Sequence, residues 1–316
     1  MRVNGTGSSH RASLLARRND LRRGLSPGEV LVVAAIVAIV ILVALVSLPR
    51  QREQARIAGC RRNLLQIGLG LALYERVEGQ LPRVAPLDPS PSTAPPLRAI
   101  LESLVIPDLD GLTDAAKPPK PQPGSVPNER PVRGFTCPSD LASSTAGHVA
   151  PVSYRATTGD RVSGETGGFA PGRAWKSTEI EEGDGRSFTA AYSERRLGTG
   201  HPEAAPANYR KVTGPLDADG CPSDREGAWS GDAGASWSLL SWSSTLYNHT
   251  LAPNALPSCL ADDGKSAHMG ASSLHVSGVN VLMFDGSVRT VTPSIALPVW
   301  KAMATVTSPS VPSALP

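Results

Sequence analysis

Aromatic residues are scarce in this chain, because phenylalanine, tryptophan and tyrosine make up only 4% of its 316 residues. Glycine and proline are plentiful by comparison, with 30 and 29 residues. This composition predicts a loop-rich body with a modest core and argues against a compact helical enzyme. The net charge is only +3. No basic patch with interleaved aromatic residues is present, so we expect no nucleic-acid partner.

Several enzyme motifs are also missing from the sequence. It has no G-x-S-x-G nucleophile elbow, no H-E-x-x-H zinc motif and no P-loop pattern. A C-x2-C pair, which often begins a structural zinc site, is absent as well. We therefore expect no enzymatic activity, no metal and no cofactor. The alternative of an anchored hydrolase lacks any nucleophile context.

What the chain does contain is one long apolar run. Nineteen residues lie between Glu29 and Pro49, and all but Ser47 are valine, leucine, isoleucine or alanine. As a helix they would extend about 28 Å, close to the hydrocarbon thickness of a bilayer. Because lipid offers the backbone no other hydrogen-bond partner, the sequence predicts a transmembrane helix over residues 25–48.

Two other interpretations of the apolar run remain open. A cleaved secretory signal would have a shorter core, of about 7–15 residues, followed by an A-x-A-like site. The segment Ala44-Leu45-Val46-Ser47 matches that site poorly. An uncut signal anchor would keep the same helix. Arginines on both sides of the run leave the positive-inside rule nearly undecided.

The residues just before the run, Arg22-Arg23-Gly24-Leu25-Ser26-Pro27-Gly28-Glu29, resemble the processing site of a type IV prepilin or type II secretion pseudopilin. The resemblance implies that prepilin peptidase cuts after Gly24, that Leu25 becomes the methylated N-terminus, and that Glu29 pairs with a neighbour's amine during assembly. Two features depart from the usual pattern. Leu25 stands where Phe or Met is common, and Pro27-Gly28 replaces an apolar pair.

This resemblance also implies a location and partners. The chain would cross the bacterial inner membrane once, with a cytoplasmic N-terminus and most of its length periplasmic or extracellular. Its partners would be the lipid bilayer, prepilin peptidase, and like subunits or other pseudopilins.

A second resemblance follows the rest of the chain. The run Cys60-Arg61-Arg62-Asn63-Leu64-Leu65-Gln66-Ile67-Gly68-Leu69 is similar to a segment of a large bacterial family of prepilin-like proteins. That family carries a domain of unknown function and a C-terminal H-x9-D-G motif. Further matches occur in the same order, and we expect structural roles for their residues: Cys137, Ser139, Asp184, Gly185, Glu194, His275, Asp285 and Gly286.

The expected fold class is α+β, with a long pilin-like N-terminal helix, transmembrane and then amphipathic, packed on a loop-rich, mainly antiparallel β domain. The expected segments are a basic leader at 1–24, the transmembrane helix at 25–48, an amphipathic continuation at 49–81, a Pro-rich connection at 82–131, an exported β-rich domain at 132–305 and a loose tail at 306–316.

Spacing supports the individual elements. Ile57, Leu64, Ile67, Leu71 and Tyr74 form one helical stripe, which Leu65, Leu69 and Leu73 would widen. Strands are expected at 189–192 and 236–246, and short helices at 97–104 and 297–304. Residues 279–291 read as a hairpin, with Asp285-Gly286 in a type I′ turn.

His275 and Asp285 suggest a catalytic pair, but their spacing argues against one. Ten residues of straight strand would separate them by about 30 Å. The Asp-Gly pair is explained by the turn, so we expect His275 to be a structural, hydrogen-bonded histidine.

Cys60, Cys137, Cys221 and Cys259 allow three disulfide pairings if the body is exported. We prefer Cys221–Cys259. Two bridges, or one bridge with two free thiols, remain equally open, and zinc is less favoured.

Calcium is a further alternative. Asp217-Ala218-Asp219-Gly220, with Asp224 nearby, resembles part of a calcium loop but lacks the third acidic ligand and the closing Glu. Some major pseudopilins hold calcium in a C-terminal loop, so the resemblance keeps calcium open. A solvated turn is the preferred interpretation.

Together these features predict a prepilin-like, membrane-anchored structural protein that assembles into a type II secretion or type IV pilus-like filament. The alternative is a signal-anchored envelope binding module that does not polymerise.

Overall fold

The computed structural model describes residues 26–87, 95–103, 131–141 and 148–307. The chain divides into two compact units, Met1–Arg52 and Glu53–Pro316. The leader with Gly24, the residue Leu25 and much of the Pro-rich connection lie outside the described residues.

In the first unit, the described residues form the beginning of helix α1, which runs from Pro27 to Glu78. Ser26 and Glu29 cap its start reciprocally. The Glu29 N–H donates to the Ser26 hydroxyl, and the Glu29 carboxylate accepts from the Ser26 N–H at 2.8 Å. This capping box satisfies backbone donors that a helix start would otherwise leave unpaired. Glu29 therefore has a local structural role at the start of the helix, beside the role in assembly that the resemblance implies.

The expectation of a transmembrane helix is wrong. Within the described part of the chain, no helix combines the length and the apolar character that a membrane crossing requires. Helix α1 extends well beyond the apolar run, and its later part from Gln51 is charged and amphipathic. The body is mixed α+β with two sheets. The expected fold class, with its pilin-like transmembrane helix, is corrected accordingly.

In the second unit, the later part of α1 packs on the larger sheet. Leu64, Ile67 and Leu71 are at most 3% exposed and share a core cluster with strand residues such as Tyr192 and Leu282. Side chains lie three and four residues apart on one helix face, so this predicted stripe becomes the contact face. Gly68 allows the close approach, because a Cβ there would lie only 2.9 Å from a Leu282 methyl group.

The residues expected to widen this stripe point elsewhere. Leu65, Leu69 and Leu73 are 48%, 54% and 36% exposed. Val77, four residues further along, is 80% exposed. Residues spaced by four share a helix face, so these four form a second apolar stripe that the body does not cover. We call it the outer stripe of α1.

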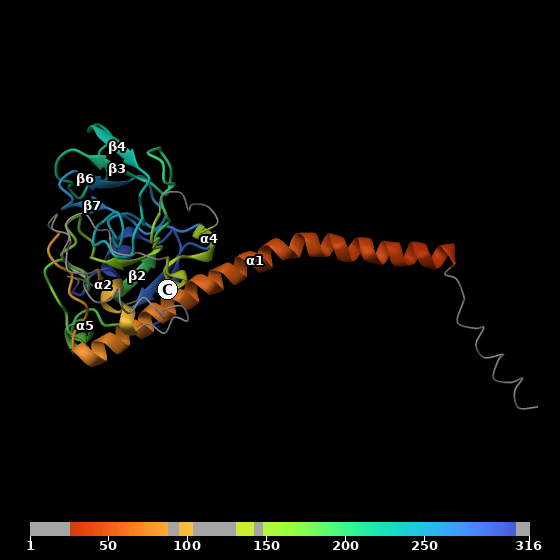
Figure 1. Ribbon diagram of the computed structural model, residues 1–316, viewed down its shortest axis with the longest axis horizontal. Helices are drawn as coiled ribbons and strands as arrows, with labels where there is room; N and C mark the ends of the chain where they lie inside the picture. The colour runs from red at the N-terminus through yellow and green to blue at the C-terminus, as the bar shows by residue number, and fades with distance from the viewer. Residues whose placement is uncertain (1–25, 88–94, 104–130, 142–147, 308–316) are drawn as a thin grey trace, which may run out of the picture. The chain divides into compact units, whose positions relative to one another are not determined.

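The larger sheet has five strands in the order β5-β1-β2-β8-β9. Its strands are β1 (Tyr154–Thr157), β2 (Ala190–Glu194), β5 (Leu246–Tyr247), β8 (Val279–Met283) and β9 (Val288–Val291). All pairs are antiparallel except β1 with β5. A second sheet has the order β4-β3-β6-β7, and only β3 with β6 is parallel (Figure 1). Its strands are β3 (Tyr209–Val212), β4 (Gly227–Ser230), β6 (Ser258–Ala261) and β7 (Ala267–His268).

The central strands are buried on both faces, which explains their sequences. Every residue of β1, β2 and β8 is buried. Along β8, Val279, Val281 and Met283 join a cluster with Trp300, whereas Leu282 joins the cluster that includes α1. Because side chains alternate along a strand, Asn280 shares the α1 side of the sheet with Leu282. This places a polar side chain close to the N-terminal helix.

The short helices of the body lie mostly in connections. They are α2 (Pro96–Ala99), η2 (Leu101–Ser103), η3 (Arg133–Phe135), α4 (Pro138–Leu141), α5 (Ser177–Glu182) and α6 (Leu297–Ala302). Helices were expected at 97–104 and 297–304, and the structure confirms a helical segment in each region. The strand at 189–192 is confirmed by β2. The strand at 236–246 is wrong, because only Leu246 of that range lies in one.

The hairpin at 279–291 is confirmed, but its turn differs from the expectation. The N–H of Met283 donates to the carbonyl of Ser287, so three residues form the loop. Gly286 has φ +85, while Asp285 is not among the residues with positive φ. A type I′ turn needs positive φ at both central residues. The loop is instead a turn closed by a left-handed glycine.

Candidate functional site

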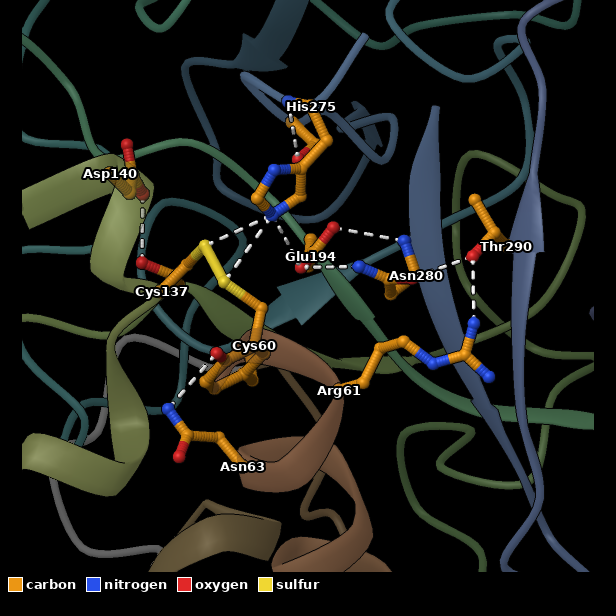
Figure 2. Close-up of polar contacts among 12 residues, drawn as sticks. Cys60, Arg61, Asn63, Cys137, Asp140, Glu194, His275, Asn280 and Thr290 are labelled. Carbon is orange, nitrogen blue, oxygen red and sulfur yellow. Dashed lines mark hydrogen bonds and ion pairs between the residues drawn. A yellow bond between two sulfur atoms is a disulfide. The ribbon is translucent and has the colours of Figure 1, made fainter. Parts of the chain in front are cut away.

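Four residues from distant parts of the chain meet on the α1 side of the larger sheet (Figure 2). Cys60 comes from α1, Cys137 lies just before α4, Glu194 ends β2, and His275 lies in the loop before β8. All four are at most 4% exposed. Cys60 and Cys137 form a disulfide across 77 residues of sequence. We call this group the His275 cluster.

Local structure places each member of the cluster. Cys60 falls on the buried stripe of α1, one turn before Leu64. Asn63, one turn along the same helix, donates to the carbonyl of Thr136 at 3.1 Å and so holds the segment that carries Cys137. Glu194 is paired with Tyr154 in the β1–β2 register. The cluster is therefore set by the packing of α1 on two central strands.

The imidazole of His275 lies at the centre of the group. Its Nε2 atom is 3.3 Å from Cys60 Sγ, 3.4 Å from Cys137 Sγ and 3.5 Å from Glu194 Oε1. Its Nδ1 atom is 2.8 Å from Glu53 Oε1, on α1. Burial by itself lowers the pKa of His275, but the hydrogen bonds and negative charges of Glu194 and Glu53 outweigh it, and the pKa is raised. The two carboxylates thus favour the imidazolium form beside the disulfide.

A chain of hydrogen bonds fixes the Glu194 carboxylate. Asn280 donates to it twice, from its backbone N–H at 2.9 Å and from its amide at 3.0 Å. Thr290 donates to the Asn280 amide oxygen at 2.9 Å, and Arg61 donates to the Thr290 hydroxyl at 3.2 Å. This chain returns to α1 one residue after Cys60. Glu194 is therefore held in one orientation, as a buried carboxylate needs to be.

Asp140 forms a second polar anchor next to the cluster. Its carboxylate accepts hydrogen bonds from the Ser153 hydroxyl and the Leu197 N–H, both at 2.8 Å. Burial raises the pKa of Asp140 despite these bonds. Ser139 is also buried, and its hydroxyl has no hydrogen-bond partner within the described ranges.

A small cavity of about 10 Å³ lies beside the cluster and is lined by Cys137, Asp140, Glu194 and their neighbours. Such a volume has room for about one water molecule. The cluster therefore borders a space too small for an organic ligand.

Other residues singled out from the sequence lie elsewhere. The Asp184 carboxylate accepts from the Thr305 hydroxyl at 3.0 Å, and Gly185 has φ +88 at a turn. Asp285 accepts from the N–H of Ser287 at 2.8 Å within the hairpin loop. Asp285 and His275 thus contact different partners in the structure. The family-motif glycines Gly185 and Gly286 both have positive φ and lie in turns.

The remaining predicted sites are a second cysteine pair and an acidic segment. Cys221 and Cys259 form a disulfide at the smaller sheet, which is the pairing preferred from the sequence. Asp217, Asp219 and Asp224 are exposed, and Asp217 accepts from the N–H of Asp219 at 3.0 Å. That contact describes a solvated turn.

Sequence reasoning missed the residues that surround the cluster: Glu53, Arg61, Asn280, Thr290 and Ser153. Glu53 was visible as the lone acidic residue among arginines after the apolar run. Nothing in the sequence links it to His275, which lies 222 residues away.

Over residues 49–297 the chain matches a family described as "Protein of unknown function (DUF1559)". No curated protein and no solved structure matches it significantly.

Proposed function

The chain belongs to this family of unknown function, and we propose that it is a prepilin-like structural subunit of the cell envelope. In this proposal, the apolar part of α1 packs side by side with the same helix of other copies, and the α+β body is displayed by the assembly. No reaction on a substrate is involved.

The observation that supports the proposal most is the uncovered surface of α1. Apolar side chains along its first part are between 49% and 71% exposed: Val30, Leu31, Val32, Val33, Ile36, Val37, Ile39, Val40, Ile41, Leu42, Val43 and Leu45. An apolar surface of this extent is normally covered by another molecule.

The distribution of these side chains favours several neighbours over one. They lie around the whole helix rather than along a single stripe, and a helix that is apolar on all sides is normally surrounded. The outer stripe of α1, with Leu65, Leu69, Leu73 and Val77, adds uncovered apolar surface on the same helix. Contact between copies along α1 would bury both the apolar first part of the helix and the outer stripe.

Processing is part of the same proposal. Cleavage after Gly24 would leave Leu25 as the N-terminus, next to the capping box at Ser26 and Glu29. The amine of one copy could then pair with the Glu29 carboxylate of a neighbour. We also propose that prepilin peptidase makes this cut and that the chain belongs with the prepilin-like proteins that carry the H-x9-D-G motif.

The cysteines support an exported body. Both pairs, Cys60–Cys137 and Cys221–Cys259, form disulfides in the structure, and disulfides persist mainly in oxidising compartments. A periplasmic or extracellular location is therefore included in the proposal.

Two measurements on the full chain, produced in a bacterium with a prepilin peptidase, test this proposal. Mass spectrometry of the N-terminus is expected to find a chain that starts at methylated Leu25. An intact Met1, or a start beyond Leu48, would contradict the processing step.

Substitutions at Glu29 distinguish a role in assembly from a role in helix capping. Glutamine can replace glutamate in a capping box, so Glu29→Gln keeps the cap but removes the charge. We expect Glu29→Gln and Glu29→Ala both to prevent association of differently tagged copies. If Glu29→Gln associates normally and only Glu29→Ala fails, the residue acts as a cap and amine pairing is excluded.

The alternative is an envelope binding module that never polymerises. It predicts that copies stay monomeric whatever stands at position 29. Persistent monomers of the processed wild-type chain would therefore favour this alternative over assembly.

A further inference from the structure

The His275 cluster brings together four side chains of the kinds that bind zinc. We propose that, when Cys60 and Cys137 are reduced, these two thiolates bind one Zn²⁺ ion together with His275 Nε2 and Glu194 Oε1. The inference is independent of the assembly proposed above. It departs from the expectation that the chain holds no metal, which relied on the missing C-x2-C pair.

Distances within the cluster support a tetrahedral site. The four donor atoms all lie within 4.8 Å of one another. Zinc bonds of about 2.0–2.3 Å place neighbouring tetrahedral ligands roughly 3.3–3.8 Å apart. The contacts of His275 Nε2 with Cys60 Sγ, Cys137 Sγ and Glu194 Oε1 are 3.3, 3.4 and 3.5 Å. The two sulfur atoms, which are joined in the structure, would have to move apart.

The surrounding hydrogen bonds match those of zinc ligands. A metal-binding histidine usually donates its other ring nitrogen to a carboxylate, which fixes the tautomer. Here His275 Nδ1 contacts Glu53 Oε1 at 2.8 Å, so a neutral ring with its proton on Nδ1 presents the Nε2 lone pair to the metal. Asn280 holds Glu194 through two hydrogen bonds. Both ligands are thus oriented before any ion binds.

Disulfide and zinc are then alternative cross-links at one place. A dithiol reductant would give two electrons and two protons to the Cys60–Cys137 bond and become a disulfide itself. Zinc binding would release the two thiol protons and, from the imidazolium form of His275, the proton on Nε2, while the proton on Nδ1 stays hydrogen-bonded to Glu53. A disulfide oxidant would accept two electrons from the two thiolates and become a dithiol, which would reform the Cys60–Cys137 bond and expel the ion. In both states α1 stays tied to the segment before α4.

Cobalt titration of the full chain tests the site. The chain carries Cys221→Ser and Cys259→Ser, so that only one cysteine pair remains, and is kept in mild detergent. It is reduced with a phosphine without oxygen. We expect one Co²⁺ per chain, with a thiolate-to-cobalt charge-transfer band and the intense visible bands of a tetrahedral site, both removed by Zn²⁺. The oxidised chain is expected to show neither band.

Variants assign the ligands. Cys60→Ser and His275→Gln are expected to abolish the tetrahedral spectrum. Glu53→Gln, which changes the partner of His275 Nδ1 and removes an exposed ion pair with Arg56, is expected to weaken binding about 10–100-fold. His268→Gln is the matched control, because His268 is another buried histidine, in the smaller sheet. It should leave the cobalt affinity unchanged.

Several results would overturn the proposal. They are a folded, reduced chain that gives no tetrahedral spectrum, or a spectrum that persists in Cys60→Ser. If reduction unfolds the chain, added zinc must restore its near-ultraviolet circular dichroism, and failure to do so refutes the site. X-ray absorption of the zinc-loaded protein must show two sulfur ligands at about 2.3 Å. A shell of nitrogen and oxygen alone would also refute it.

Discussion

His249 is fully buried and stacks on the indole of Trp300, with ring centroids 3.5 Å apart. Its Nδ1 atom lies 2.6 Å from the Trp300 carbonyl oxygen, and its Nε2 atom lies 3.0 Å from the Tyr247 hydroxyl. A neutral ring that donates from Nδ1 and accepts at Nε2 satisfies both partners. Burial lowers the pKa of His249 to about 3, although the bond to Trp300 opposes the shift.

This shift predicts acid sensitivity. Between pH 6.5 and about 3 the unfolded chain binds a proton at His249 that the folded chain does not. The free energy of unfolding therefore falls as the pH falls through this range, by up to about 1.4 kcal/mol per pH unit. Urea unfolding of the wild type and of His249→Gln at pH 7 and pH 4.5 measures the effect. We expect the wild type to lose about 2–3 kcal/mol more than the variant.

Carboxylates also titrate in this range, but they do so in both proteins. The comparison therefore isolates His249. Equal losses in the wild type and the variant would show that the buried ring is not the source of the acid sensitivity.

At the residue scale, the sequence identified the members of the His275 cluster, but it did not predict that they contact one another in the folded chain. Cys60, Cys137, Glu194 and His275 each fell in a short motif. The spacing argument predicted no direct pair of His275 and Asp285, and in the structure the two residues contact different partners. The true partners of His275 are 81 to 222 residues distant: Glu194, Cys137, Cys60 and Glu53. Such contacts depend on tertiary packing, and no local pattern records them.

At the scale of elements, side-chain competition explains the strand that was wrongly expected at 236–246. Ser236 and Ser241 accept hydrogen bonds from the backbone N–H groups of Ser238 and Ser244, both at 3.1 Å. Serine side chains that bond to nearby backbone groups offer an alternative to a β ladder. The apolar residues of this segment looked like a strand, but its serines form turns.

The two apolar faces of α1 show a similar limit of prediction from helical spacing. Helical spacing correctly gave the stripe that includes Leu64, Ile67 and Leu71, because a buried face repeats with the helix period. It also predicted that Leu65, Leu69 and Leu73 widen this stripe, but the structure leaves them exposed. Spacing shows which residues share a face but not which face the body covers.

The outer stripe gives a prediction for the proposed assembly. Leu69 is 54% exposed and near the middle of the stripe, so Leu69→Glu should fold normally but place a charge in a helix–helix contact. We expect the affinity between copies to fall at least about tenfold, a loss of about 1.4 kcal/mol or more. Co-purification of differently tagged copies over a concentration series measures it.

Val149→Glu serves as the control, because Val149 is 60% exposed and lies outside α1. It should associate as the wild type does. Equal weakening by both substitutions, or by neither, would remove the outer stripe from the proposed interface.

At the scale of the whole chain, composition correctly indicated a loop-rich body. The strands are short, from two to five residues each, and they form two sheets. The division into sheets was not predictable. It depends on pairings such as β1 with β5 and β3 with β6, which are parallel and join distant segments. The hydrophobic pattern predicts that a segment is a strand, but it does not predict which other strand pairs with it.

The two disulfides restrain the unfolded chain over different lengths. Cys60–Cys137 closes a separation of 77 residues and Cys221–Cys259 one of 38. Loop-closure entropy gives both about 4 kcal/mol, with only about 0.6 kcal/mol in favour of the longer loop. Chemical unfolding of the oxidised full chain, with each pair replaced by alanines, measures these losses.

The position of the first pair should enlarge its effect. Its sulfur atoms are the nearest neighbours of the buried His275 ring on one side, so alanines there leave a cavity beside a buried ion pair. Cavities add to the cost of a lost side chain. Cys221 is partly exposed, and its replacement opens less space. We expect the Cys60→Ala/Cys137→Ala chain to be less stable than the Cys221→Ala/Cys259→Ala chain. The difference should clearly exceed the entropic difference of about 0.6 kcal/mol. Equal losses would mean that the His275 cluster keeps its packing without its sulfurs.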